Sequence, residues 1–208
     1  LNCIDSIAKA VEVQPSPVVD IIEDIRCASE ASTFTSNSTI ASGSITSNTW
    51  MINNNVYQGN TVDYLFNNPG EYEITLISRG SNLCQASGSE TITIFPLPSA
   101  DFQFTKPCSN EHITFTSTSF SDGDPIEDFT WTLDGQVVSF AESFGERIEQ
   151  TGTHTMELEV STVNNCVNTS TKDVEVFAAP VSAFKAEPVR GAAPLDVTFT
   201  NQSVDATS

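Results

Sequence analysis

The stretch Gly-Thr-His-Thr-Met-Glu-Leu-Glu-Val, residues 152–160, decides the fold of this chain. Its apolar residues Met156, Leu158 and Val160 alternate with polar residues. A period of two is typical of a β-strand with one buried and one solvated face. The phrase Gly-Glu-Tyr-Glu-Ile-Thr-Leu-Ile at residues 70–77 has the same pattern and begins 82 positions earlier. The strand therefore belongs to an internal repeat.

An offset of 81 or 82 positions recurs along the chain. Trp131 follows Trp50 by 81 positions, and Phe115 follows Phe34 by 81 positions. Proline-containing joints separate the repeats at residues 95–98 and again at 177–180. We therefore divide the chain into the last strand of a preceding repeat, two full repeats, and the start of a truncated third repeat, at residues 1–13, 14–95, 96–177 and 178–208.

Each full repeat predicts an all-β fold. Seven or so short strands per repeat, with turn signals such as Asp134-Gly135 between them, favour an immunoglobulin-like β-sandwich. Short proline-containing joints are semi-rigid, so we expect tandem sandwiches in an extended row. The expected core residues are the Trp and the second-strand Phe of each repeat, namely Trp50, Trp131, Phe34, Phe115 and Phe199.

The composition excludes some partners. The chain carries 8 Lys+Arg against 27 Asp+Glu, a formal net charge of −19. Such a polyanion is repelled by nucleic acid and by anionic lipid. No apolar run approaches the roughly 20 residues that span a bilayer. We expect a solvated acidic surface that resists aggregation, without nucleic acid as a partner and without a membrane span in this segment.

Parts of the chain resemble a known family. Residues 183–188 and 191–203 resemble the opening of a PKD (polycystic kidney disease) domain, and residues 70–76 look like that family's Gly-x-Tyr-x-Val-x-Leu strand. The family's Trp-x-Phe-Gly-Asp-Gly motif is degraded to Trp-Thr-Leu-Asp-Gly at 131–135 and to Trp-Met-Ile-Asn-Asn at 50–54. The resemblance implies two divergent PKD-like units between partial repeats.

The resemblance also implies a function. The paired cysteines and the Asn-Cys turn are similar to PKD-like arrays in long Bacteroidetes surface proteins, including gliding-motility adhesins exported by type IX secretion. It implies a non-enzymatic stalk or adhesin that is secreted or displayed on the cell surface. Its partners would be the neighbouring repeats, extracellular glycans or surfaces, and the secretion or motility machinery. The alternative is a spacer in a secreted hydrolase, with weak glycan binding by exposed aromatic residues such as Tyr57 or Phe140.

The cysteines recur in register, which predicts disulfides rather than a metal site. Two pairings stay open. One lies within repeats, Cys27–Cys84 and Cys108–Cys166. The other joins Cys27 to Cys166 between repeats and leaves Cys3, Cys84 and Cys108 for other repeats. The second is slightly favoured, because the turns that carry Cys27 and Cys84 lie at opposite ends of an immunoglobulin-like sandwich, too far apart for a disulfide.

Motifs for catalysis or cofactor binding are scarce. Asp122 and Asp124 form a weak candidate for Ca²⁺, since carboxylates are hard oxygen ligands, but the spacing is not that of a calcium loop. His112 and His154 lie in alternating strand patterns and lack the spacing of zinc ligands. There is no Gly-x-Ser-x-Gly elbow and no phosphate loop. We therefore expect that the chain has no enzymatic activity and binds no cofactor, apart from the weak calcium candidate.

Overall fold

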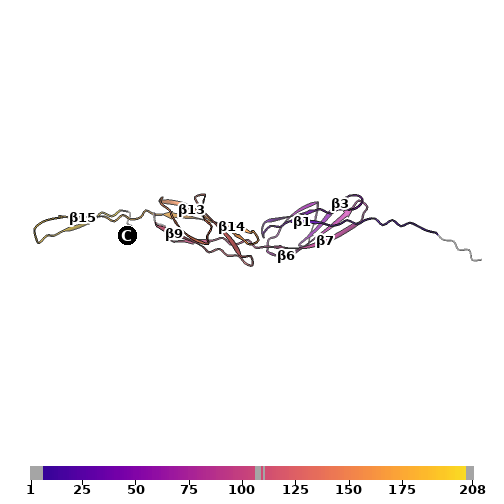
Figure 1. Cartoon of the computed structure of the whole chain (residues 1–208), viewed down its shortest axis with the longest axis horizontal. Helices are drawn as coiled ribbons and strands as arrows, with labels where there is room; N and C mark the ends of the chain where they lie inside the picture. The colour runs from indigo at the N-terminus through magenta and orange to yellow at the C-terminus, as the bar shows by residue number, and fades with distance from the viewer. Residues whose placement is uncertain (1–6, 106–108, 110, 205–208) are drawn as a thin grey trace, which may run out of the picture. The chain divides into compact units, whose positions relative to one another are not determined.

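The computed structural model describes residues 7–105, 109 and 111–204 of the 208-residue chain. Every regular element in that part is a β-strand. The chain divides into two compact units, Leu1–Leu97 (unit 1) and Pro98–Ser208 (unit 2). Figure 1 shows both units.

Unit 1 contains two antiparallel sheets. One sheet has the order β1-β2-β5, and the other has the order β4-β3-β6-β7. The strands are β1 Ile21–Asp24, β2 Ala31–Ser36, β3 Ile45–Ile52, β4 Asn55–Gln58, β5 Thr61–Leu65, β6 Gly70–Gly80 and β7 Gln85–Ile94. Asn53 and Asn54 have φ values of 47° and 62°, as the tight turn of the β3–β4 hairpin requires. This is the two-sheet arrangement of an immunoglobulin-like sandwich.

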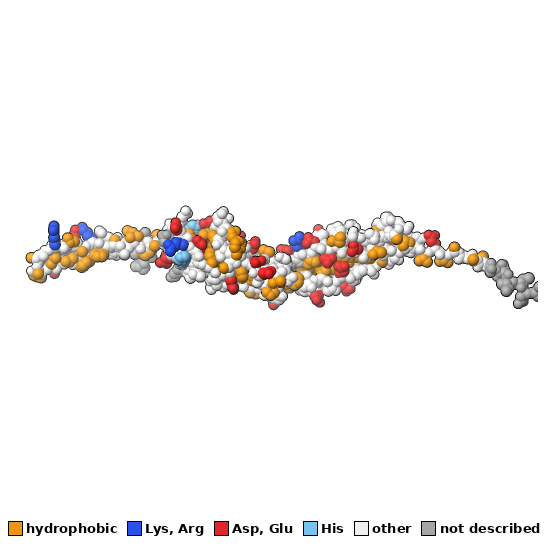
Figure 2. All heavy atoms as spheres, in the orientation of Figure 1, with side chains coloured by type: hydrophobic (Ala, Val, Ile, Leu, Met, Phe, Trp, Pro, Cys, Tyr) orange, Lys and Arg blue, Asp and Glu red, His pale blue; other side chains and the backbone are white. Residues whose placement is uncertain are grey.

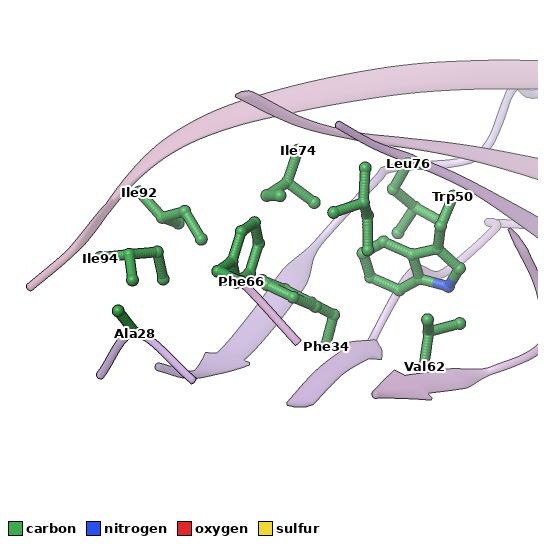
Figure 3. Packing of buried hydrophobic residues seen from close by; sticks show 10 residues of the cluster. Ala28, Phe34, Trp50, Val62, Phe66, Ile74, Leu76, Ile92 and Ile94 are labelled. Atoms are coloured by element: carbon green, nitrogen blue, oxygen red, sulfur yellow. The ribbon is translucent and has the colours of Figure 1, made fainter. Parts of the chain in front are cut away.

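The core of unit 1 lies between its sheets. Figure 3 shows Trp50, Phe34, Phe66, Ile74 and neighbouring side chains filling that space. Trp50 is fully buried, and its indole Nε1–H donates to the carbonyl oxygen of Gly59 at 3.0 Å. The indole is the largest side chain between the two sheets, and its N–H has a partner although it is buried.

Unit 2 repeats the arrangement. Its sheets have the orders β12-β9-β8 and β11-β10-β13-β14. The strands are β8 Phe102–Phe104, β9 His112–Ser117, β10 Ile126–Leu133, β11 Gln136–Ser139, β12 Ser143–Arg147, β13 Gly152–Thr162 and β14 Val167–Val176. The alternation read in the sequence is present on β13, where Met156, Leu158 and Val160 are buried.

The core of unit 2 contains a cluster of aromatic rings around Trp131. Trp131 is fully buried, and its Nε1–H donates to the carbonyl oxygen of Ala141 at 2.8 Å. The rings of Phe102, Phe115 and Phe144 surround it at centroid distances of 5.2, 6.1 and 5.3 Å. Aromatic pairs at such distances add to the stability given by burial.

The structure locates the step in the repeat offset. β4 and β11 begin 81 positions apart, at Asn55 and Gln136, whereas β5 and β12 begin 82 positions apart, at Thr61 and Ser143. The loop after β11 therefore holds one residue more than the loop after β4. Phe140 lies in this longer loop, and its side chain is 73% exposed.

The two terminal parts contain less regular structure than the full repeats. Residues 7–13, the described part of the predicted strand 1–13, belong to no strand. A strand is stabilised by pairing, and here those residues have no ladder partner. Residues 178–204 form the hairpin β15 (Phe184–Glu187) and β16 (Thr198–Asn201), two strands of the predicted third repeat.

The prediction that Phe199 is a core residue is wrong in this structure. Phe199 is 68% exposed, and its ring contacts Phe184 at a centroid distance of 5.8 Å. In units 1 and 2, the corresponding Phe34 and Phe115 are covered by the sheet that carries the Trp. No such sheet lies over β15 and β16 among the described residues, so the aromatic face stays open.

The acidic residues are spread over the surface. Asp and Glu side chains lie at many separate places on the face shown in Figure 2. The described residues contain no helix that is long and apolar enough to cross a membrane.

Candidate functional site

The cysteines fall into two chemical states. Cys27 and Cys166 are disulfide-bonded and buried. Cys84 is a free, half-buried thiol in the described part of the chain. Cys3 and Cys108, which the sequence also assigns to disulfides, lie outside the described residues.

Cys27 lies at the end of unit 1 where the chain leaves its last strand. It occupies the turn between β1 and β2, in which Glu30 N–H donates to the Cys27 carbonyl at 3.0 Å. The next residue, Ala28, donates its N–H to the carbonyl oxygen of Phe95 at 2.9 Å. Phe95 follows β7 and begins the proline-containing joint, so Cys27 lies beside that joint.

Cys166 lies at the end of unit 2 where the chain enters it. It closes the β13–β14 turn: Thr162 N–H donates to the Cys166 carbonyl at 3.0 Å, and Cys166 N–H donates to Thr162 Oγ1 at 3.1 Å. Two residues later, Asn168 Nδ2 donates to the carbonyl oxygen of Pro98 at 2.7 Å. Pro98 is the first residue of unit 2, so this cysteine too lies near the joint.

Cys84 occupies the same turn in unit 1. Gly80 N–H donates to the Cys84 carbonyl at 2.9 Å, and Asn82 Nδ2 donates to the carbonyl oxygen of Pro15 at 2.8 Å. Leu83 has φ 67° where Asn165 of unit 2 has φ 59°. Cys84 therefore lies at the end of unit 1 where the chain enters, next to Pro15.

This geometry excludes one of the two pairings for Cys27. Cys84 immediately precedes β7, and Cys27 lies beside Phe95 just after the end of the same strand. The 10 residues of β7 rise by roughly 33 Å, whereas a disulfide requires Cα atoms within about 7 Å. Cys27 is bonded and Cys84 is free, so a Cys27–Cys84 bond is absent. The Cys27–Cys166 and Cys108–Cys166 pairs stay predictions.

The two calcium candidates do not form one site. Asp122 is exposed, whereas Asp124 is 1% exposed. The carboxylate of Asp124 accepts from Thr162 Oγ1 at 2.5 Å and from Asn164 Nδ2 at 2.8 Å. In the described ranges, no three His, Cys, Asp or Glu side chains are grouped so that they could hold a metal ion. Asp124 therefore acts as a structural bridge to the β13–β14 turn.

The sequence missed a contact of His154. Its Nδ1 lies 2.7 Å from Asp134 Oδ2, and its Nε2 lies 3.1 Å from the carbonyl oxygen of Gln150. The Asp134 carboxylate and, more weakly, the Gln150 carbonyl raise the pKa of His154 despite partial burial. The signal for this contact was the repeat offset, which places His154 where unit 1 has Tyr72 and Asp134 where unit 1 has Asn53.

Within residues 7–105, 109 and 111–204, neither histidine is hydrogen-bonded to a serine hydroxyl. Among the hydrogen bonds of the described residues, His154 contacts a carboxylate and a carbonyl rather than a serine hydroxyl. His112 is exposed on β9, opposite Arg147 of β12. A Ser-His-Asp relay requires a hydroxyl within hydrogen-bond reach of the imidazole. The contacts of His154 in the described part of the chain are therefore structural contacts within unit 2.

Comparison with solved structures supports the fold. An eight-domain immunoglobulin fragment of the Down syndrome cell adhesion molecule aligns with a TM-score of 0.55 and 16% identity over 84% of this chain and 25% of that one. The chain thus spans a quarter of that fragment. Fibronectin(III)-like modules of Clostridium thermocellum CbhA align with a TM-score of 0.47 and 13% identity, over 77% of this chain and 94% of theirs.

A PKD domain is also among the matches. The PKD1 domain of Vibrio anguillarum Epp aligns with a TM-score of 0.38 and 19% identity, over 41% of this chain and 99% of that domain. No family model and no curated protein matches the sequence. The match above a TM-score of 0.5, to immunoglobulin domains, supports a fold of tandem immunoglobulin-like β-sandwiches.

Proposed function

We propose that the chain is a non-enzymatic structural segment of a large secreted or surface-displayed repeat protein, namely the stalk of an adhesin. The observation that carries the proposal is the placement of the cysteines. Cys27 lies beside Phe95 at the exit of unit 1, and Cys166 lies near Pro98 at the entry of unit 2. Cysteines at the two borders of one short joint suit a covalent tie between consecutive repeats.

The disulfide chemistry supports an extracytoplasmic setting. Disulfides persist in oxidising compartments and are rare in the cytosol. Each unit already has a closed apolar core around its Trp, so a disulfide is not needed to compensate for a small core. A bond from Cys27 to Cys166 would instead limit bending at the joint, which is the property that a stalk needs.

The acidic surface supports the same function. The net charge of −19 is carried by side chains spread over the chain, and these keep neighbouring molecules apart at low salt. Export by type IX secretion and a role in gliding motility are the finer proposal. They rest on the sequence resemblance to Bacteroidetes arrays.

One observation favours the second candidate, a glycan-binding or spacer module of a secreted hydrolase. Phe140 is 73% exposed in the loop where unit 2 has its extra residue. Exposed aromatic rings can stack on sugars. Tyr57, the other aromatic residue predicted for this role, is half-buried and packs against Tyr64 at 5.9 Å, which makes it less suited to stacking.

Protease treatment of intact source cells tests the proposal. An antibody to this chain should detect a very large parent protein that external protease removes without lysis. A small protein found free in the medium, or one that survives until the cells are lysed, would overturn the stalk function. For the second candidate, Phe140→Ala should abolish retention on a polysaccharide column, with Phe120→Ala as the matched control because Phe120 is also exposed.

A further inference from the structure

His154 is enclosed by hydrogen-bond acceptors on both sides of its ring. Asp134 Oδ2 faces Nδ1 at 2.7 Å, and the Gln150 carbonyl faces Nε2 at 3.1 Å. The His154 side chain is 12% exposed. Asp134 is itself fixed, because its Oδ1 accepts Thr155 N–H at 2.8 Å and its own N–H donates to the Thr155 carbonyl at 2.9 Å.

This geometry selects the protonation state of the imidazole. A neutral imidazole has one N–H donor and one nitrogen lone pair, whereas an imidazolium has two N–H donors. Only the imidazolium can donate to Asp134 and to Gln150 at once. In the neutral form, a nitrogen lone pair would face one of the two oxygens, and that contact would be repulsive.

Among the residues that the structure describes, one charged group acts on the His154 ring. Asp134, on the β10–β11 turn, is the charged group that acts on the ring. Opposite His154, β14 presents Val174, which does not titrate. The pKa of His154 is raised by the Asp134 hydrogen bond, and the pKa of Asp134 is lowered by the same bond.

Unit 1 keeps the contact to the backbone carbonyl, but its two side chains at these positions bond to other partners. Tyr72 holds the position of His154, and its Oη–H donates to the carbonyl oxygen of Asn68 at 2.9 Å. Asn53 holds the position of Asp134, and its Nδ2 donates to Tyr64 Oη at 3.2 Å. These contacts are made by phenol and carboxamide groups rather than by an imidazole and a carboxylate, so these positions of unit 1 hold no counterpart of the His154–Asp134 pair.

We propose that His154 and Asp134 form a proton-dependent contact that fastens the β10–β11 turn to the start of β13, so that acidification strengthens unit 2 and leaves unit 1 unchanged near neutral pH. The sign follows from linkage. A His pKa that is higher in the folded state stabilises the fold below the unfolded value, near 6.5, and the gain is lost as pH rises through the folded value. The lowered Asp134 pKa means that the contact also fails in strong acid.

The two tryptophans allow each unit to be measured separately in the intact chain. Trp50 reports unit 1 and Trp131 reports unit 2, because each indole N–H is bonded inside its own core. Urea unfolding followed by the two indole NMR signals at pH 6.0 and pH 8.5 should show a lower midpoint at pH 8.5 for Trp131 alone. Between pH 6.0 and pH 8.5, the equilibrium constant for unfolding of unit 2 should rise. The rise should be at most about tenfold for each pH step by which the pKa of His154 in the folded state exceeds its pKa in the unfolded state.

The variant His154→Tyr carries the residue of unit 1 and should remove the pH dependence of the Trp131 midpoint. His112→Gln, which changes the other histidine, should retain it. Should His154→Tyr fail to fold, direct NMR titration of the His154 ring in the unchanged chain decides the matter. Equal Trp131 midpoints at the two pH values, or a His154 ring that is neutral at pH 7, would overturn the proposal.

Discussion

Lys172 in unit 2 and Glu90 in unit 1 occupy the same position of the last strand, 82 residues apart, with opposite charges. Lys172 pairs with Asp101 at 2.7 Å, donates to the Phe102 carbonyl and lies 4.9 Å from the centre of the Phe102 ring. Its cationic head is therefore held by a carboxylate, a carbonyl and a π face.

Glu90 has the reverse surroundings. Partial burial and the neighbouring carboxylates of Glu23 and Asp20 raise its pKa. Asp20 is the counterpart of Asp101, so the acidic partner is kept while the base is replaced by a third acid. The fold tolerates a stabilising pair in one unit and a repulsive cluster in the other, which shows that the shared core, rather than this surface charge, determines the architecture.

The buried cross-strand pairs differ as well. Asn48 lies opposite Ser78 in unit 1, where unit 2 has Phe129 opposite Val160. Ser78 Oγ donates to Asn48 Oδ1 at 2.7 Å, and Asn48 Nδ2 donates to Asn60 Oδ1 at 3.2 Å. The polar pair of unit 1 is stable only if each buried polar group has a hydrogen-bond partner. The apolar pair of unit 2 needs only side chains that fill the space.

The largest expected effect tests what the units share. Trp50→Ala should destabilise unit 1, and Trp131→Ala should destabilise unit 2, each by about 3–5 kcal/mol, because each change leaves a large cavity. Urea unfolding followed by the remaining indole signal measures the untouched unit. We expect its midpoint to stay in place. A common loss in both units would show that they share one core.

The next effect is confined to unit 2. Asp124→Ala removes the buried carboxylate from Thr162 and Asn164 and should cost about 1.5–3 kcal/mol, the range for hydrogen bonds to a charged group. Thermal unfolding measures the change, with the exposed Asp122→Ala as the control, expected within about 0.5 kcal/mol of the unchanged chain. Equal losses in the two variants would point instead to a shared ligand, which calcium titration would identify.

A smaller effect converts the polar pair of unit 1 into the apolar pair of unit 2. Ser78→Val alone should destabilise unit 1 by about 1–3 kcal/mol, because the buried Asn48 amide loses a partner. Adding Asn48→Phe should recover much of that loss. The coupling is measured by a double-mutant cycle in urea. Additive losses would mean that the two positions do not act as one pair.

The smallest effect concerns the surface charge. Glu90→Lys should stabilise unit 1 by up to about 1 kcal/mol at neutral pH and low salt, because it replaces repulsion from Glu23 and Asp20 by attraction. A raised Glu90 pKa means that its protonated form stabilises unit 1 in acid and that this gain is lost as pH rises through its range. Chemical unfolding at pH 4 and pH 7 should show this fall only in the unchanged chain. If Glu90→Lys lost stability between pH 4 and pH 7 as the unchanged chain does, a group other than Glu90 would cause the loss.

Much of the fold was predictable from period-two alternation and from the repeat offset. Met156, Leu158 and Val160 of β13, for instance, are buried, as the alternation at residues 152–160 predicts. The strand β4 has only four residues, which is too short for an alternating pattern to mark it in the sequence. The buried role of Asp124 was also out of reach, since its partners Thr162 and Asn164 lie about forty residues away in the sequence.

Other features depended on what covers a residue rather than on the residue itself. Phe199 and Phe115 are both the centre of a Thr-Phe-Thr triplet, yet one ring is 68% exposed and the other is fully buried. The contact of His154 with Asp134 requires the register of β10 and β13, which no local pattern contains. Comparison of equivalent positions was the most informative sequence signal, because it marks where one unit departs from the other.

Non-reducing peptide mapping of the intact chain, alkylated under denaturing acid conditions, tests the central claim that a disulfide ties consecutive repeats. We predict one crosslinked species that joins the peptide of Cys27 to the peptide of Cys166, with Cys84 recovered as an alkylated thiol. Recovery of Cys27 linked to Cys84, or of Cys166 linked to Cys108, would contradict the account and reduce the joint to a proline linker.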